Sequence, residues 1–155
     1  MDDEYSTLLF DAYKDELLGE ALFGALAARD SGDHAAKLRA LQRIEGTTAA
    51  QLRPLVSAMG IEVTAADEAA ARSQGAEIGD GGVEWDDLMK DLHDALPSYL
   101  ANFVRLRSIA PDPSDPAMVT LVNHEQAINA FTELELAGCS DRSIAVLQWH
   151  LETVS

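Results

Sequence analysis

Cysteine is almost absent from this sequence, with Cys139 the single example among 155 residues. One cysteine cannot form an intramolecular disulfide, and a CxxC redox pair or a cysteine-rich metal cluster is also excluded. We therefore expect a reducing, cytoplasmic setting. A chain of this length buries a substantial core without disulfides, so residues 1–155 are expected to form a single domain.

Basic residues are also scarce. The chain has 11 Lys and Arg against 27 Asp and Glu, which gives a formal net charge of -16. Affinity for nucleic acids and for anionic membranes depends mainly on clustered Lys and Arg. The sequence therefore predicts no nucleic-acid partner and no membrane partner.

Long apolar runs are missing as well. The first residues, Met1 to Tyr5, are acidic and lack the basic start and apolar run of a signal peptide. No later segment is an uninterrupted apolar stretch of the length that a membrane span needs. No strong β pattern is present either. Together these absences favour a soluble, all-α protein.

The sequence does contain strong helical periodicity. Apolar residues recur at intervals of three and four in four long segments, at about 5–29, 34–59, 85–108 and 117–137. Asp141 is placed to cap a short fifth helix. The residues between 61 and 84 offer only a short helical candidate after Thr64, followed by the glycine-rich breaker at 79–82. We expect an antiparallel four-helix bundle with a long crossover between the second and third helices.

Three glutamates occupy positions where the helical period requires apolar core residues: Glu20, Glu45 and Glu125. Burying a lone carboxylate costs several kcal/mol even after relaxation, so a shared compensating charge is expected. A metal ion would supply it. Pairing with an arginine or hydrogen bonding to a neighbouring helix are the alternatives. Glu16 lies in the same stripe as Glu20, but we expect it to point toward the bundle edge.

Other polar residues near these stripes have simpler interpretations. His124 precedes Glu125 and lies about 100° around the helix from it, so only one of the two is expected to point fully inward. Thr48 is expected to bond to its own preceding turn. Tyr99 and Asn102 are candidates for hydrogen bonding to the carboxylates. Glu135 is too far along its helix to join the same site.

These features together resemble the ferritin-like superfamily. The resemblance rests on an acid within residues 19–23, an acid within residues 43–48, the long connection, and the His124-Glu125 pair. Members with an active centre place a Glu on each of two helices and a Glu-x-x-His on each of the other two, around two iron or manganese ions. Here Thr48 and Ile128 occupy the expected histidine positions, and the third helix has no inner acid.

The resemblance implies iron or manganese as the cofactor. By the same pattern the metal ligands would be Glu20, Glu45 and Glu125, with His124 added to the set. The corresponding activity is oxygen- or peroxide-linked redox chemistry. The alternative is a metal-free bundle that acts as a binding or assembly module. For that module, Leu18, Leu22 and Leu26 form an apolar face through which we expect a homodimer.

Overall fold

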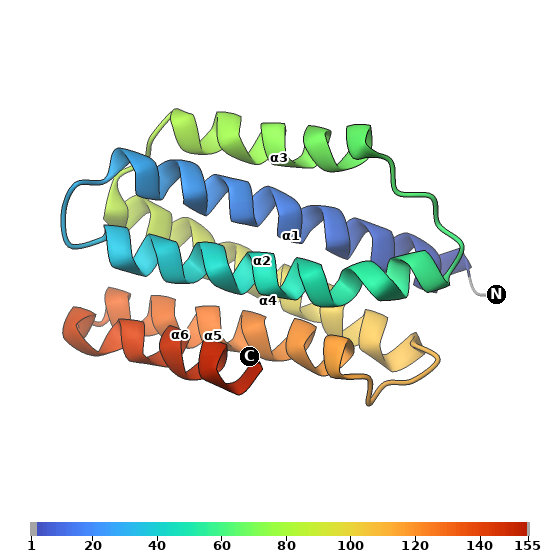
Figure 1. Ribbon diagram of the computed structural model, residues 1–155. Coiled ribbons are helices and arrows are strands. Elements are labelled where there is room, and N and C mark those ends of the chain that lie inside the picture. The colour runs from blue at the N-terminus through green and yellow to red at the C-terminus, as the bar shows by residue number, and fades with distance from the viewer. Residues whose placement is uncertain (1–2, 155) are drawn as a thin grey trace.

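The computed structural model describes residues 3–154, and within that range every regular element is a helix, which confirms the expected all-α class. The six helices of the described range are α1 (Asp3–Arg29), α2 (Ala35–Ala58), α3 (Ala65–Asp80), α4 (Trp85–Ile109), α5 (Pro116–Leu136) and α6 (Ser140–Val154). Their axes run roughly alongside one another, with α3 covering α1 and α6 lying beside α5 (Figure 1).

The contacts between helices define the interior. α1 packs extensively on α2, α4 packs on α5, and two further contacts, α2 with α5 and α1 with α4, close a ring. α3 packs on the outside of α1, and α6 packs on α5 and α2. The contact between α1 and α4 is the least extensive of these, so the ring is loosest along that side.

Local sequence signals account for several helix ends. Thr64 accepts a hydrogen bond from the backbone N–H of Asp67, whose side chain accepts one from the backbone N–H of Thr64, and this reciprocal capping starts α3. Asp115 caps α5, and Pro116 follows in the first turn, where a missing N–H costs nothing. Gly138, with φ of 79°, turns the chain between α5 and α6.

The crossover contains a 16-residue helix, which is longer than the short candidate expected from the sequence. The expected breaker at 79–82 is wrong in its first half, because Gly79 and Asp80 are still helical. Gly75 and Gly79 lie against the backbone of α1: an added Cβ at Gly75 would lie 2.1 Å from the carbonyl oxygen of Leu18. These glycines therefore permit close helix packing, and α3 covers part of the apolar face of α1.

Buried apolar side chains form two clusters, one toward each end of the helical assembly. The clusters meet at similar heights on the helices of the ring. The boundaries fall between Leu17 and Phe23 on α1, between Ile44 and Ala49 on α2, between Leu96 and Phe103 on α4, and between Val122 and Ile128 on α5. A polar layer occupies this boundary, and it contains the candidate site.

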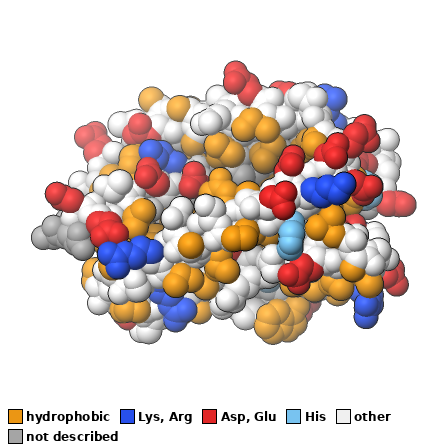
Figure 2. All heavy atoms as spheres, turned by 180° about the vertical axis from the view of Figure 1, so that it is seen from behind, with side chains coloured by type: hydrophobic (Ala, Val, Ile, Leu, Met, Phe, Trp, Pro, Cys, Tyr) orange, Lys and Arg blue, Asp and Glu red, His pale blue; other side chains and the backbone are white. Residues whose placement is uncertain are grey.

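The surface is acidic, as the composition requires. The face opposite the view of Figure 1 carries more Asp and Glu than Lys and Arg, scattered among apolar side chains (Figure 2). Within residues 3–154, no helix combines the length and apolarity needed to cross a membrane.

Candidate metal centre

Four ionisable side chains meet in the polar layer between the two apolar clusters. They are Glu16 of α1, Glu45 of α2, and His124 and Glu125 of α5, and their exposed fractions are 2%, 7%, 0% and 6%. Side chains of these types are rarely buried so completely unless they are paired or bind a metal. Three carboxyl groups around one imidazole therefore require a compensating interaction.

The orientation of His124 is set by its own helix. The ring Nδ1 lies 2.5 Å from the backbone carbonyl oxygen of Leu121, which only accepts hydrogen bonds, so Nδ1 carries the proton and donates it. A proton on Nε2 would form ion pairs with the carboxylates of Glu16 and Glu125, and without that proton Nε2 presents a lone pair to the site. Metal-ligating histidines are commonly held in this way, with one ring nitrogen bound to a carbonyl and the other free for the ion.

Two carboxylate oxygens lie close to this nitrogen. Nε2 of His124 lies 3.1 Å from Oε1 of Glu16 and 3.4 Å from Oε1 of Glu125. Glu45 completes the group, because Glu16, Glu45 and His124 each offer a ligand atom within 4.8 Å of the others. Without a proton or a cation between them, the lone pair of a neutral imidazole would repel these oxygens.

Several atoms in the centre lack partners. Oε2 of Glu16, Oε2 of Glu125 and Nε2 of His124 are buried and make no hydrogen bond. An unpaired buried polar atom costs about 1–3 kcal/mol, and more when the group is charged. A single cation at this position would contact several of these atoms at once.

Two glycines make room for the acids at the α1–α2 contact. A Cβ on Gly19 would lie 2.9 Å from both Cδ and Oε2 of Glu45, so the carboxyl group of Glu45 occupies the space above this glycine. In a similar way, a Cβ on Gly46 would lie 3.0 Å from Cδ of Glu20. Each helix therefore places one glutamate over a glycine of the other helix. Of these two glutamates, only Glu45 enters the buried centre.

Burial raises the pKa of all three carboxyl groups. It raises the pKa of Glu16 to about 8, although a hydrogen bond to Glu45 partly opposes the shift. The pKa of Glu45 lies well above its usual value, because burial and then the charge of Glu16 disfavour its ionised form. Burial also raises the pKa of Glu125 to about 7, against the opposing effect of His124. In the absence of a cation, the centre therefore holds protons at neutral pH.

A small cavity of about 100 Å³ adjoins the acids. Glu16, Glu45 and Glu125 line part of it, and most of its remaining wall is apolar, including Leu22, Leu92 and Ile128. Apolar walls keep the number of water molecules near the carboxylates small, which strengthens any electrostatic interaction with a cation.

The structure gathers three of the four residues that the resemblance implied as ligands. Glu45 and His124 lie in the close group with Glu16. Glu125 lies outside that group but approaches Nε2 of His124 at 3.4 Å, whereas Glu20 is only partly buried and lies against Gly46. Glu16 takes the place on α1 that the sequence assigned to Glu20. The expectation that Glu16 points toward the bundle edge is wrong, because only 2% of it is exposed.

Other sequence expectations are resolved by the same geometry. Thr48 donates a hydrogen bond to the carbonyl oxygen of Ile44, so its interpretation as a self-satisfied core residue is confirmed. Tyr99 lines the small cavity but is 41% exposed, and Asn102 lies outside that cavity. Both His124 and Glu125 are buried, contrary to the expectation that only one points inward.

The burial of both side chains follows from the neighbours of α5. This helix packs against α2, α4 and α6, so it is enclosed over more of its circumference than a helix with a single inner face. A prediction from helical periodicity assumes that a helix has one buried face. It therefore underestimates the burial of a helix that is enclosed on several sides.

Glu135 belongs to a separate cluster near the other end of α5, as expected. Its carboxylate accepts hydrogen bonds from Lys37, Trp85 and Ser143, with a distance of 3.0 Å to Nε1 of Trp85 and 2.6 Å to the hydroxyl of Ser143. These donors hold the pKa of Glu135 below its usual value despite burial, which opposes them. The cluster links α2, α4, α5 and α6.

No protein-family model, curated protein or solved structure matches this chain.

Proposed function

We propose that this protein is a ferritin-like metalloprotein that binds iron or manganese through Glu16, Glu45, Glu125 and His124. The observation that carries the proposal is the buried Nε2 of His124, which lies 3.1 and 3.4 Å from carboxylate oxygens of Glu16 and Glu125. A divalent cation placed among these atoms would be coordinated by them in place of the protons that the centre otherwise holds.

The donor set suits the proposed metals. Carboxylate oxygens and one imidazole are typical ligands for divalent iron and manganese, whereas zinc and copper sites more often use several imidazoles or thiolates. Three ionised carboxylates would offset the charge of one divalent ion and leave a net charge of about -1. With a single histidine in the group, the set is better matched to one ion than to two.

The arrangement of the helices supports the ferritin-like part of the proposal. The ring of α1, α2, α5 and α4, with a long connection between α2 and α4, has the connectivity expected of that class. Bound iron or manganese would supply one-electron redox chemistry toward oxygen or peroxide. The chain itself would hold the ion, limit water through the apolar cavity wall, and accept or release protons at Glu16 and Glu125.

Metal titration tests this proposal. Protein stripped with a chelator and titrated anaerobically with Mn²⁺ in a calorimeter is expected to bind close to one ion per chain. Glu45→Gln and His124→Gln should each weaken binding at least tenfold, since each removes a donor atom from the ion. Glu133→Gln, an exposed acid on α5, is the matched control and should bind as the wild type does. Absence of saturable binding to the wild-type protein would refute the proposal.

The second candidate is a metal-free helical module in which protons satisfy the centre. The close approach of the carboxyl groups of Glu16 and Glu45 favours it, because a proton on one of them could be donated to the other. The homodimer belongs to this candidate and stays a prediction. The face bearing Leu18, Leu22 and Leu26 packs partly against α3, since Gly75 lies against the backbone of Leu18 and Gly79 lies against the backbone of Leu22. Light scattering at micromolar concentration tests the dimer, and a monomer mass would contradict it.

A further inference from the structure

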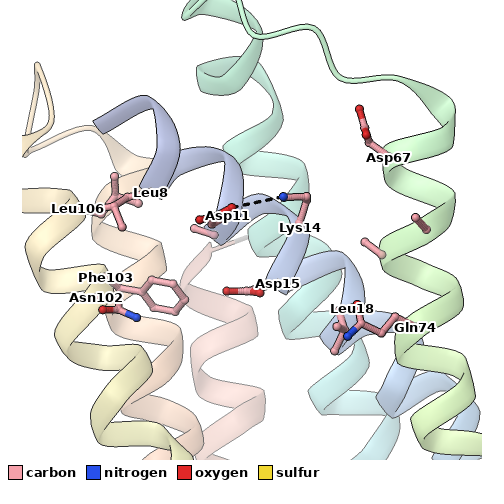
Figure 3. Close-up of a pocket in the computed structure, with 13 residues that line it drawn as sticks. Leu8, Asp11, Lys14, Asp15, Leu18, Asp67, Gln74, Asn102, Phe103 and Leu106 are labelled. Carbon is pink, nitrogen blue, oxygen red and sulfur yellow. Dashed lines mark ion pairs between the residues drawn. The ribbon is translucent and has the colours of Figure 1, made fainter. Parts of the chain in front are cut away.

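A groove of about 510 Å³ lies on the surface between α1, α3 and α4. It exists because α3 and α4 both pack on α1 while leaving a space between them. In Figure 3, Asp11, Lys14, Asp15 and Leu18 enter the groove from α1, with Asn102 and Phe103 on the α4 side. The groove is therefore open to solvent on one side and bounded by the loosest contact of the ring on the other.

The groove and the small inner cavity share two lining residues, Asp15 and Leu18. The inner cavity in turn is lined by Glu16, Glu45 and Glu125. A path from solvent through the groove to the buried acids would therefore pass beside Asp15 and Leu18. The side chain of Asp15 points from α1 toward α4, across the gap between these helices (Figure 3).

Charge along this path favours a cation. Asp11, Asp15 and Asp67 line the groove, and the only base among its lining residues is Lys14. Lys14 is paired with Asp11, at 3.3 Å between Nζ and Oδ1, so it offsets that acid and leaves Asp15 without a paired base in the groove. At the inner end of the path, Glu16 and Glu125 present buried, unpartnered oxygens.

We propose that Asp15 is the entry residue through which a divalent cation passes from the groove to the centre formed by Glu16, Glu45, Glu125 and His124. This inference rests on the proposed function. Asp15 is exposed and lies outside the close group, and no approach to His124 joins it to that group as one joins Glu125, so its role is in the rate of uptake and not in the final coordination. Its negative charge attracts the cation and lowers the barrier to leaving bulk water.

Stopped-flow uptake of Co²⁺ by chelator-stripped protein at pH 8, followed by the visible absorption of the bound ion, tests the proposal. Asp15→Asn is expected to slow uptake about tenfold at low salt while the amount bound at equilibrium stays the same. Asp15→Glu should restore the rate. Lys14→Gln should accelerate uptake, because it removes the positive charge from the groove.

Asp87→Asn provides the matched control, since this exposed acid in the first turn of α4 lines neither cavity. It should take up Co²⁺ at the wild-type rate. Rising salt should slow the wild type more than Asp15→Asn, because screening removes an attraction that the variant lacks.

The possible failures are distinguishable. Equal rates for wild type, Asp15→Asn and Asp87→Asn would overturn the entry role and leave the metal centre standing. A lower equilibrium affinity or capacity in Asp15→Asn would also overturn it, because Asp15 would then be a ligand. If the wild type takes up no Co²⁺ and no Mn²⁺, the proposed function and the entry route fail together.

Discussion

One turn of α1 separates Glu16 from Glu20, and the two differ sharply in environment. Only Glu16 reaches His124, whereas Glu20 lies against Gly46 at the partly exposed α1–α2 contact. Helical periodicity places both residues on the same stripe, so sequence alone could not choose between them. The choice depends on the rotation of α1, which is set by its contacts with α2 and α3.

This difference gives a prediction about affinity. Glu16→Gln should weaken Mn²⁺ binding at least tenfold, because a neutral amide replaces a charged donor within 3.1 Å of Nε2 of His124. Glu20→Gln removes the same charge one turn away and should change affinity less than threefold. Calorimetric titration of the two variants compares them directly. A larger loss in Glu20→Gln would show that the ligand implied by the resemblance is correct and that Glu16 is not.

The buried carboxyl groups also predict a pH dependence for the metal-free protein. Their pKa values are raised in the folded state, to about 8 for Glu16 and about 7 for Glu125, so the folded chain binds more protons than the unfolded chain above pH 4.5. Stability should therefore fall as pH rises from about 4.5 to about 8, by up to about 1.4 kcal/mol per pH unit for each extra proton held.

Urea unfolding in EDTA at several pH values measures this dependence. Glu16→Gln should make the slope shallower, because one of the groups that must lose a proton is gone. Adding Mn²⁺ should stabilise the wild type more at pH 8 than at pH 5, since ion binding requires deprotonated carboxylates. A stability that rises between pH 5 and pH 8 in EDTA would contradict the assigned pKa shifts.

At the scale of elements, the glycines in and just after α3 have two different roles. A glycine-rich stretch usually marks a helix end, and Gly81 and Gly82 do mark one. Gly75 and Gly79 instead lie four residues apart on the side of α3 that touches α1. A single sequence gives no direct sign of which glycines permit close packing, because that depends on the partner helix.

Close packing of α3 leads to a prediction about stability. Gly75→Ala should destabilise the protein by about 2 kcal/mol, because its Cβ would lie 2.1 Å from the backbone oxygen of Leu18 and α3 must move outward. Gly81→Ala is the control: its Cβ would lie 3.4 Å from the nearest oxygen, that of Ile78, at a negative φ. Urea unfolding should show little change for Gly81→Ala. Equal stability of the two variants would contradict the tight α1–α3 contact.

The Glu135 cluster gives a second prediction at this scale. Glu135→Leu should destabilise the protein by about 3 kcal/mol, because the buried ammonium group of Lys37 loses its carboxylate partner. Adding Lys37→Met to Glu135→Leu should recover part of the loss, since the unpaired charge is then removed. Glu133→Ala, at an exposed position, should have little effect. Urea unfolding measures the stability of all three variants. An unchanged free energy of unfolding in Glu135→Leu would show that the cluster contributes little to stability.

At the scale of the whole molecule, the order and approximate bounds of the helices could be predicted from periodicity and capping residues. The long segments recognised in the sequence correspond to α1, α2, α4 and α5, and the short final segment corresponds to α6. Which helices pack side by side could not be predicted as well, because it depends on contacts between residues far apart in the chain. The polar layer is an example: its residues come from α1, α2 and α5, and their spacing in the sequence does not show that they meet.

The central claim is that the buried layer holds a divalent cation between Glu16, Glu45 and His124. Anomalous scattering from crystals grown with Mn²⁺, recorded on both sides of the manganese absorption edge, tests it most directly. The account predicts one strong anomalous peak within coordination distance of Nε2 of His124 and the carboxylates of Glu16 and Glu45. A well-ordered centre with no peak, and with the carboxyl groups hydrogen-bonded to one another and to His124, would contradict it.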